Sequence, residues 1–523
     1  MHIHLPHIDH HALKGSRSDE LKKSLKGMKF GLEKEGLRVN PADGSLAKTA
    51  HPKELGSALT HPQITTDYSE VLLEFVTGTH TRPMEALAEL EMLQSYTASV
   101  IGKERIWPLS MPCRLPQSDV DIPLAYYGES HIGRLKTVYR RGLGFRYGRQ
   151  MQTIAGVHFN MSFSDNFWAF HSALHNHPVD SDVRTRRDIG YFHTIRNFRR
   201  IQWIFMLLTG ASPAVDESFR LLATDRFKVT GRSRIAKGST TLRMSDLGYQ
   251  SAAQESINLC FNHLNTYCHS LAEAVHQPWP TYEGLGLKDG VGFKQLSTAV
   301  LQIENEYYSS IRPKRVQLND ERPVRALINR GVEYLEVRAI DLNPFARNGI
   351  SEIEACLITL LMTTSALADS PLNSPQESDA ISGINARTTW AGRQPEQKFD
   401  QKHSFKAAAI EFLSSLDPLA ESLDEALDTN GHTEALIDAR LRLGGTCPLI
   451  SDEIEAAATD NGHLEFGLSM ADQHHEMWLN HFNTDTIDLL KKTANNSLKK
   501  EKTLTSTNKG SFDDFVRAYV NLP

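Results

Sequence analysis

The chain of 523 residues is 40% hydrophobic and 23% charged, a balance typical of soluble globular proteins and large enough for several domains. Its formal net charge of -6 gives no electrostatic case for binding nucleic acid or an anionic membrane, and no apolar run approaches the ~20 residues that span a bilayer. The five cysteines are few, odd in number and without C-x-x-C spacing, so we expect a reducing, cytoplasmic location rather than a disulfide framework or a zinc site.

Residues 1–28 are predicted to form a polar arm that leads into a short helix, without the pattern of a signal peptide. Five histidines in this arm could bind metal ions nonspecifically, but a mobile terminus is the favoured interpretation. These histidines are His2, His4, His7, His10 and His11.

Residues 29–77 are predicted to form a strand, a turn and a second strand, because Asn40-Pro-Ala-Asp-Gly44 is a strong turn signal. Glu33 and Glu35 stand among apolar residues of the first strand, and their spacing places both carboxylates on one face, roughly 7 Å apart. Glu74 lies in the apolar run of the second strand.

The segment from Pro83 to Ile101 is predicted to be a helix, because large apolar residues recur at helical spacing. Residues 131–154 are basic with interleaved aromatic residues, a pattern that can bind nucleic acid. Since the whole chain is acidic, an anionic small-molecule site or a plain solvated helix is favoured instead. A strand at residues 156–162 places His158 and Asn160 on one face.

Three further helices are expected, at residues 185–210, 251–274 and 350–368. His171, His175 and His177 have the spacing of metal ligands, but the Asn-His-Pro sequence beside them is typical of a surface loop. We therefore predict no metal site at these histidines.

Residues 291–345 are predicted to hold two more strands, separated by Ile311-Arg-Pro-Lys-Arg315. The first carries Glu304 and Glu306, and the second carries Glu336 and Arg338, again two residues apart. After about residue 370, polar runs with prolines indicate linkers between helices. The chain is accordingly divided into an N-terminal arm (1–28), a catalytic core (29–368) and a mainly helical region packed on or appended to it (369–523).

Four strand-like segments thus carry acids between large apolar neighbours. Buried carboxylates repel one another and lose hydration unless a cation or hydrogen bonds compensate. Oxygen ligands suit hard cations such as Mg²⁺ or Mn²⁺. We interpret the set as one sheet whose concave face holds several divalent ions, although ordinary solvated sheet faces explain the pattern about equally well.

Several metal ions bound by carboxylates would neutralise a polyphosphate, and Arg338 could stabilise a transferring phosphoryl group with two hydrogen bonds. The chain has no Walker A or G-x-G-x-x-G motif, so metals and basic side chains would have to hold the nucleotide. Arg312, Lys314 and Arg315 are candidates, but a solvated basic turn explains any one of them equally well. The residues alone predict a metal-dependent enzyme acting on a nucleotide phosphate, with no acceptor identified.

Several segments between residues 29 and 368, in order and with similar spacing, resemble the proteobacterial glutamate–cysteine ligases. They are Gly31–Asn40, Leu59–Tyr68, Trp107–Cys113, Met151–His158, Leu242–Tyr249, Leu301–Glu306, Ile311–Arg315, Glu333–Arg338 and Asp341–Phe345. Each segment alone is a weak signal, but the ordered set is specific. Residues after 368 match only loosely.

This resemblance implies an α+β, glutamine synthetase-like fold, in which an antiparallel sheet forms a funnel with helices outside. It implies that ATP phosphorylates the γ-carboxylate of L-glutamate and that the amine of L-cysteine then displaces phosphate, giving γ-glutamylcysteine, the first step of glutathione synthesis. The implied cofactor is Mg²⁺, with Mn²⁺ as the alternative, and ATP is a co-substrate. Feedback inhibition by glutathione and a monomeric state are further expectations.

The resemblance also assigns roles to individual residues. Arg338 matches the arginine that stabilises the transferring phosphoryl group. The residues that match ligands of three Mg²⁺ ions are Glu33, Glu35, Asp67, Glu74, His158 and Glu336. The residues that match substrate contacts are Arg140 and Arg243, for substrate carboxylates, and Tyr68, Tyr139, Leu143, Gln152, Tyr249 and Tyr308, for the cysteine pocket.

Chemistry alone would make His158 a core histidine, since imidazole suits softer metals than Mg²⁺, and core packing would equally explain Leu143. Lys34 and Tyr68 depart from the family, where arginine and phenylalanine are expected, and the extra phenol of Tyr68 puts the selectivity for cysteine in doubt. Two alternatives stay open: a ligase with another amine acceptor, and a non-catalytic regulator on the same scaffold. The retained set of buried charges argues against the regulator.

Overall fold

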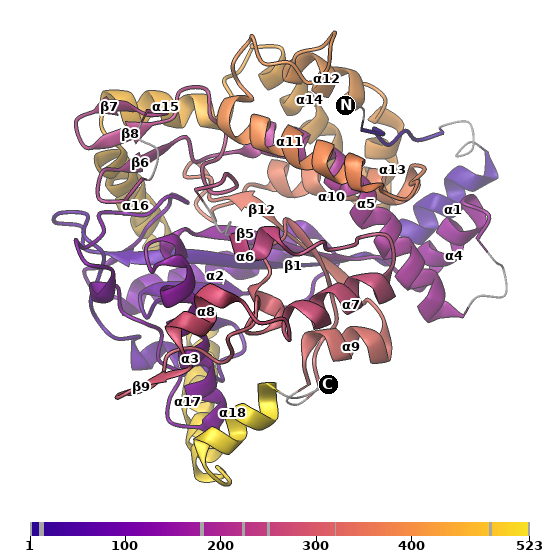
Figure 1. Ribbon diagram of the computed structural model, residues 1–523. Helices are drawn as coiled ribbons and strands as arrows, with labels where there is room; N and C mark the ends of the chain where they lie inside the picture. Colours follow the sequence, from indigo (N-terminus) through magenta and orange to yellow (C-terminus); the bar gives the residue numbers. More distant parts are fainter. Residues whose placement is uncertain are drawn as a thin grey trace.

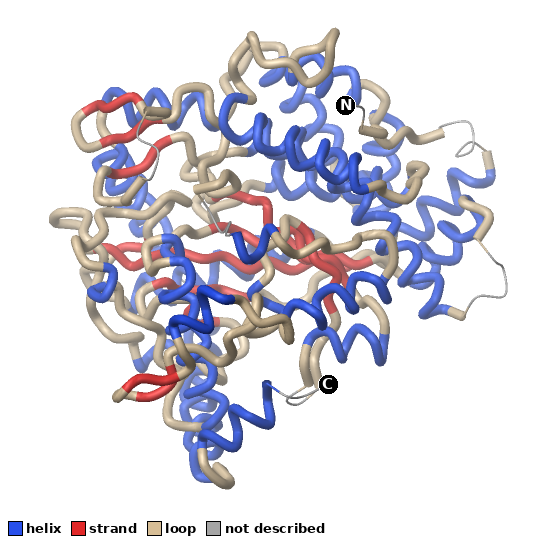
Figure 2. Tube along the Cα trace, in the orientation of Figure 1, coloured by secondary structure: helices blue, strands red, loops and turns tan. Residues whose placement is uncertain are grey.

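A seven-stranded antiparallel sheet runs through the middle of the molecule (Figures 1 and 2). The structure, a computed structural model, describes residues 3–9, 15–177, 182–221, 225–247, 252–318, 321–480 and 484–520. The sheet order is β11-β12-β5-β1-β3-β2, with β4 beside β1. Its strands are β1 (Lys29–Val39), β2 (Ile64–Thr66), β3 (Leu72–Val76), β4 (Arg105–Ile106), β5 (Gly156–Ser162), β11 (Ile311–Lys314) and β12 (Tyr334–Asp341). The predicted α+β class with an antiparallel sheet is confirmed.

The central strand β1 is covered on both faces, which explains why its sequence lacks a clean alternation of apolar and polar residues. Phe30 and Leu32 lie on the face that packs under helix α2 (Pro83–Val100). Lys34 lies on the same face, where its ammonium donates a 2.7 Å hydrogen bond to Gln94 of α2. Glu33 and Glu35 point from the opposite face.

β12 carries a β-bulge, which is recognised by a one-residue shift in its register with β5 between Val337 and Ile340. Val337 pairs with Phe159, whereas Ile340 pairs with Val157, so Arg338 and Ala339 together stand opposite His158. Bulges occur next to active sites because they redirect a side chain.

The predicted helices are confirmed at three places. The segment from Pro83 to Ile101 forms α2, in which proline takes the first position, where its missing N–H is not needed. Residues 185–210 form most of the long helix α5 (Val183–Thr209), which packs along α10 (Glu352–Leu367). Ser351 and Glu354 form a capping box at the start of α10, whose side chains are buried from Glu354 onward.

The single helix predicted at residues 251–274 is wrong. Within this range the structure describes two helices, α6 (Ala252–Glu255) and α7 (Leu264–Ala274). Between them the chain is held by tertiary bonds, because the side chain of Asn262 accepts from the backbone N–H of Asn373 at 2.9 Å and donates to its carbonyl at 3.0 Å. These bonds compete with helix formation.

The strand predicted to carry Glu304 and Glu306 is also wrong, since both residues lie in a short 3₁₀ turn, Glu304–Glu306. Glu306 accepts hydrogen bonds from Arg146 at 2.9 Å and from the backbone of Gln302 at 2.7 Å. Glu304 pairs with Arg322 at 3.0 Å. Both carboxylates therefore have arginine partners of their own and do not join the acids on the sheet.

Helices follow one another along the described residues after 374, and several pack on the sheet-bearing part of the chain. α14 packs against α10, α16 covers α2, and α17 reaches the loop around Ser57. These helices are α11 (Pro375–Ala391), α12 (Phe405–Leu413), α13 (Asp417–Leu427), α14 (Gly431–Leu443), α15 (Ile450–Asp460), α16 (His463–Asn480), α17 (Thr484–Ser506) and α18 (Phe512–Val520). Within the described ranges, no helix is both long and apolar enough to cross a membrane.

The remaining elements surround the sheet. The helices are α1 (Ser16–Leu25), α3 (His131–Tyr147), α4 (Asp165–Leu174), α8 (Pro280–Leu285) and α9 (Pro323–Arg330). Two small sheets are formed by β6 (Ala214–Asp216), β8 (Ser233–Ile235) and β7 (Lys228–Thr230), and by β9 (Lys288–Asp289) and β10 (Gly292–Phe293).

Candidate active site

A row of polar side chains crosses four neighbouring strands of the central sheet. Residues directly opposite each other in an antiparallel pair project from the same face. Glu35 on β1 pairs with Glu74 on β3, Glu33 pairs with His158 on β5, and Glu336 on β12 pairs with Asn160 on β5. The strand order therefore gathers acids that are about 300 positions apart in the sequence onto one surface, as the sequence predicts for Glu33, Glu35, Glu74 and Glu336.

His158 lies at the centre of this row and is almost fully buried. Its Nδ1 donates to Glu33 at 2.8 Å, and Asn160 donates to the other oxygen of Glu33 at 2.9 Å. The Nε2 atom of His158 has no hydrogen-bond partner and lies 3.8 Å from Glu35. With the proton on Nδ1, the lone pair of Nε2 is free to bind a cation.

The carboxylates differ in how well their charge is compensated. Burial, with repulsion by Asp67, Glu33 and Glu35, holds the pKa of Glu74 well above its ordinary value. Burial likewise raises the pKa of Glu35. In contrast, Lys314 and Arg338 outweigh burial at Glu336 and hold its pKa well below the ordinary value. The carboxyl groups on the side of the row nearest β3 thus lack a positive partner that would outweigh burial and favour their charged form.

These residues fit a divalent cation. Glu33, His158 and Glu336 each offer a ligand atom, and the three atoms lie within 4.8 Å of one another. Two buried atoms of this row have no hydrogen-bond partner, namely Nε2 of His158 and Oδ1 of Asn160. Such atoms are costly unless an unseen partner satisfies them. Glu35, Glu74 and Asp67 lie outside this group of three, with Asp67 just after β2.

Arg338 extends from the bulge of β12 over the row. Its NH1 atom lies 3.3 Å from Oε2 of Glu336, and its backbone carbonyl accepts a 2.8 Å hydrogen bond from Arg243. Glu336, Glu35 and Glu33 raise the pKa of Arg338 above the ordinary value despite its burial. A permanently charged guanidinium is therefore fixed beside the carboxylates.

The three basic nucleotide candidates are placed differently. Lys314 forms a 3.1 Å ion pair with Glu336 and reaches the carboxylate row. Arg312 is buried and donates to the backbone carbonyls of Asn305 and Tyr307, and Arg315 pairs with Glu333 at 3.4 Å. The cavity that they line has a volume of only about 50 Å³, too small for a nucleotide.

α3 carries three of the predicted substrate residues, and one of them contacts Asp67. Arg140 donates to the backbone carbonyl of Asp67 and lies 4.5 Å over the ring of Tyr127. Tyr139 is on the same helix, and burial raises its pKa. Leu143 is buried one turn later.

Tyr68 follows Asp67 and is fully buried, yet its hydroxyl has no hydrogen-bond partner. A Cβ added to Gly144 of α3 would lie 2.4 Å from that hydroxyl. The glycine therefore makes room for the phenol that distinguishes Tyr68 from the expected phenylalanine.

The remaining substrate candidates are spread around the row. Arg243 stacks so closely on Gly156 at the start of β5 that a Cβ there would lie 2.3 Å from the guanidinium. Gln152 is buried in the turn before β5, and the hydroxyl of Tyr308 lies 3.1 Å from the sulfur of Met244. Tyr249 lies outside the described residues.

Two residues of the site were not assigned from the sequence. Asn160 was placed on the face of His158, but its hydrogen bond to Glu33 could not be predicted without the strand order. Asp341 accepts from Ser212 at 2.7 Å and from Thr241 at 2.9 Å, and so orders the loop that carries Arg243. The sequence places Asp341 at the start of the segment Asp341–Phe345, which belongs to the family pattern, but gives it no role.

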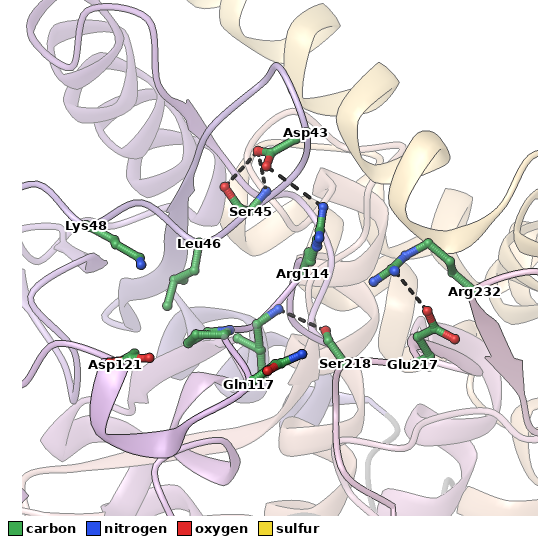
Figure 3. A pocket seen from close by; sticks show the side chains of 12 residues that line it. Asp43, Ser45, Leu46, Lys48, Arg114, Gln117, Asp121, Glu217, Ser218 and Arg232 are labelled. Carbon is green, nitrogen blue, oxygen red and sulfur yellow. Dashed lines mark hydrogen bonds and ion pairs between the residues drawn. The ribbon is translucent and has the colours of Figure 1, made fainter.

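An open hollow of about 570 Å³ shares no lining residue with the carboxylate row. Figure 3 shows the side chains that line it. Two of its arginines are paired with acids nearby: Arg114 lies 3.9 Å from Asp43, and Arg232 lies 2.8 Å from Glu217. A second hollow of about 890 Å³ adjoins Tyr307 and Tyr308 and is in the size range of small-molecule sites.

Comparisons with known proteins agree with this geometry. The model of a family described as glutamate–cysteine ligase matches residues 13–387. A glutamate–cysteine ligase from Saccharophagus degradans is 41% identical over 512 residues, covering 95% of this chain and 94% of the relative. One from Pseudomonas aeruginosa is 41% identical over 496 residues, covering 94% of this chain and 93% of the relative.

Solved structures give the same result. The crystal structure of a glutamate–cysteine ligase from Francisella tularensis in complex with AMP matches with a TM-score of 0.87 and 31% identity, covering 94% of this chain and 97% of that one. A bifunctional glutathione synthetase from Pasteurella multocida matches with a TM-score of 0.72 over 93% of this chain and 58% of its own length. At 22% identity the second match shows the fold alone. The expected ligase fold is confirmed.

Proposed function

This chain belongs to the glutamate–cysteine ligase family, and on that premise we propose how its own residues carry out the reaction. The enzyme uses ATP to join the γ-carboxylate of L-glutamate to the amine of L-cysteine through γ-glutamyl phosphate, the first step of glutathione biosynthesis. The observation that carries the assignment of residues is the row across β3, β1, β5 and β12, with Arg338 fixed beside it.

Glu33, Glu35, Asp67, Glu74, His158 and Glu336 are proposed to hold divalent cations. When bound, these cations offset the charge of the ATP phosphates. The raised pKa of Glu74 and of Glu35 supports this proposal, because both groups need a positive partner to ionise. An oxygen-rich set favours Mg²⁺, and the imidazole of His158 makes Mn²⁺ an effective substitute.

Arg338 is proposed to contact the phosphoryl group as it passes from ATP to glutamate. Its guanidinium is held by Glu336 and by the bulge, so it needs no reorientation when charge develops. Lys314, paired with the same carboxylate, is proposed to contact the nucleotide phosphates. Arg312 and Arg315 are bound to backbone carbonyls and to Glu333, so we assign them the role of holding β11 in place.

The acceptor pocket is proposed to lie between α3 and the turn that carries Asp67. Tyr68, Tyr139 and Leu143 line this region with apolar surface suited to the short side chain of cysteine. Gln152, Tyr249 and Tyr308 stay predictions from the family pattern. Arg140 and Arg243 would bind the α-carboxylates of the two amino acids, because each guanidinium lies beside the row rather than within it.

The test is ADP formation from MgATP and glutamate, with and without cysteine, together with the mass of the product. Cysteine-dependent ADP and the mass of γ-glutamylcysteine are expected. ADP that depends on another amine would keep the metal and phosphoryl roles and move the acceptor assignment. A folded sample that binds Mg²⁺ but forms no ADP with any amine would contradict the catalytic assignment and favour a regulator.

Glutathione feedback, a monomeric state and a cytoplasmic location stay predictions. The first is tested by adding glutathione at subsaturating glutamate, where competition would raise the KM for glutamate. The second is tested by the sedimentation coefficient of the full chain.

A further inference from the structure

Three histidines outside the active site lie close together. His171 is in α4, His175 follows that helix directly, and His193 is in α5. The prediction that His171 and His175 belong to a surface loop is wrong, because His171 is fully buried and the side chain of His175 is 9% exposed. We propose that these three imidazoles bind one transition-metal ion of the Zn²⁺ type, at a structural site separate from the carboxylate row.

The geometry of the three rings supports a shared ion. Their centroids lie 4.6 Å apart for His171 and His175, 4.7 Å for His171 and His193, and 4.4 Å for His175 and His193. Each residue offers one ligand atom, and these atoms lie within 4.8 Å of one another. Bonds of roughly 2.0–2.1 Å from a zinc ion at tetrahedral angles place two histidine nitrogens about 3.3 Å apart, so the rings must turn their nitrogens toward one another when an ion binds.

Unused nitrogen atoms at the centre point to a missing ligand. Neither ring nitrogen of His171 has a hydrogen-bond partner, and neither has Nε2 of His175. Burying such polar atoms without a partner costs free energy. Aromatic packing explains why the ring of His171 lies 5.4 Å from that of Trp168, but it leaves the ring nitrogens unsatisfied.

In His193 and His175, one ring nitrogen already has a polar partner, which leaves the other nitrogen for an ion. His193 donates from Nε2 to the carbonyl of Ala368 at 2.6 Å, which leaves Nδ1 for an ion. Nδ1 of His175 lies 3.6 Å from the carboxylate of Asp369, which leaves its unpartnered Nε2. Metal-binding histidines commonly use their second nitrogen in this way, for a carbonyl or a carboxylate.

The donor set selects the kind of ion. Three imidazoles suit Zn²⁺, Cu²⁺, Ni²⁺ or Co²⁺ rather than Mg²⁺. A fourth position can be filled by water or by His177, whose ring lies 5.4 Å from that of His171 and whose Nδ1 has no partner.

Charges around the site are mixed. Asp369 favours a cation, whereas Arg196, one turn after His193 in α5, opposes it. The guanidinium of Arg196 is bound to the carbonyl of Asn262 and to Ser370, so it is held in place by the surrounding chain. We therefore expect weaker binding than at a site of the same three ligands without an arginine.

The ion would join three parts of the chain: the end of α4, the first half of α5, and residues 368–369, which follow α10. Its effect would be to stabilise this junction rather than to take part in the reaction. The appropriate readouts are thus the thermal midpoint and a metal spectrum, with activity as a secondary measurement.

The experiment uses the full chain with the arm histidines replaced by alanine (His2, His4, His7, His10 and His11), so that no metal bound to the arm is counted at the site. Saturating Mg²⁺ is added to occupy the carboxylate row. Co²⁺ is titrated and followed by its visible d–d absorption, and Zn²⁺ is titrated and followed by thermal unfolding. We expect one Co²⁺ per chain with the intense bands of tetrahedral coordination, and a thermal midpoint that rises with Zn²⁺ concentration.

His175→Gln tests the site at its partly exposed edge and should weaken Zn²⁺ and Co²⁺ binding at least tenfold. His171→Phe keeps an aromatic ring in the cavity and should abolish the Co²⁺ bands while the metal-free protein stays folded. His269→Gln, on the exposed side of α7, is the matched control and should bind as the parent does. Binding that is unchanged in both site variants, or absent in the parent without arm histidines, would overturn the proposal.

Discussion

Arg338 and His158 stand opposite each other at the β-bulge between β12 and β5, with NH1 of Arg338 3.3 Å from Nδ1 of His158. Nδ1 already donates to Glu33 at 2.8 Å, so the guanidinium is held by Glu336 rather than by the imidazole. The bulge thus brings a fixed positive charge next to a histidine whose other nitrogen is free. The residue proposed to contact the phosphoryl group, Arg338 on β12, and a residue proposed to bind a cation, His158 on β5, are therefore neighbours across two paired strands.

Arg338→Lys should lower kcat by about 10²- to 10³-fold, because the ammonium keeps the charge but loses the planar pair of donors. Stability to urea should change little, since Lys can still pair with Glu336. Arg315→Lys is the control, because Arg315 pairs with Glu333 away from the row. Steady-state kinetics with saturating substrates measure the effect. A kcat equal to that of the parent would refute the role of Arg338.

Glu35→Gln should weaken the use of divalent cations, raising the Mg²⁺ concentration for half-maximal rate by about tenfold or more. The fold should persist, because an amide oxygen can still accept the 2.8 Å hydrogen bond from the backbone of Gly156. Without metal, the free energy of unfolding of the variant in urea should be higher than that of the parent by ~1 kcal/mol, because the repulsion between residue 35 and Glu74 across the strands is removed.

The control for that variant is Glu20→Gln on the exposed side of α1, which should alter neither quantity. Normal Mg²⁺ dependence in Glu35→Gln would show that Glu35 is not a ligand. A loss of stability in the metal-free state would contradict the lack of a positive partner inferred for the side of the row nearest β3.

Tyr68 and Gly144 should be coupled in stability. Gly144→Ala places a methyl group against the Tyr68 hydroxyl and should lower the free energy of unfolding, whereas Tyr68→Phe should raise it slightly, because it removes a buried hydroxyl that has no partner. In the double variant the cost of Gly144→Ala should fall, with a coupling of roughly 0.5–3 kcal/mol. Additive effects in urea unfolding would disprove the contact.

Tyr68→Phe also tests the pocket. If the phenol narrows it, the ratio of kcat/KM for cysteine over 2-aminobutyrate should change by up to about 10–200-fold. An unchanged ratio would place Tyr68 outside the acceptor pocket.

His61 makes the stability depend on pH. Burial lowers its pKa to about 4, from about 6.5 in the unfolded chain, so between these values the unfolded state binds a proton that the folded state excludes. The contribution of His61 to the free energy of unfolding is therefore fully present above pH 6.5. It falls by about 3 kcal/mol as the pH is lowered to 4.

His61→Asn keeps an acceptor for the backbone N–H groups of Gln63 and Ile64, which bond to Nδ1 of His61, but it does not titrate. When the pH is lowered from 6.5 to 4, the free energy of unfolding should fall by about 3 kcal/mol less in this variant than in the parent. His269→Asn, at an exposed site, should follow the parent. Parallel pH profiles for His61→Asn and the parent would contradict the shifted pKa.

Local patterns predicted the elements that are stabilised locally. α2 and α10 have helical spacing with start signals of their own, and the acids of β1 and β12 share a face because alternation in a strand is a property of the backbone. The family pattern, rather than spacing, supplied Asp67 and His158 as candidates. Their roles stay predictions.

The errors share a physical cause, which is a partner distant in the sequence. Glu306 turns away from the sheet because Arg146, 160 positions earlier, binds it. The histidine cluster depends on His193, which belongs to another helix, so the spacing of His171 and His175 alone could not indicate burial. The bulge at Arg338 likewise follows from pairing with β5.

Two contacts join residues about 440 positions apart: the backbone N–H of Ser57 donates to Ser497 at 2.9 Å, and the hydroxyl of Thr60 donates to the carbonyl of Ser497 at 2.6 Å. Phe512 and Val516 cover the apolar side of α3 at Leu135 and Val138. During synthesis, α3 is therefore exposed to water until about 370 further residues have been added. We expect the nascent chain to need a chaperone at α3, and the helix that carries Tyr139 and Arg140 to reach its final packing only after α18 leaves the ribosome.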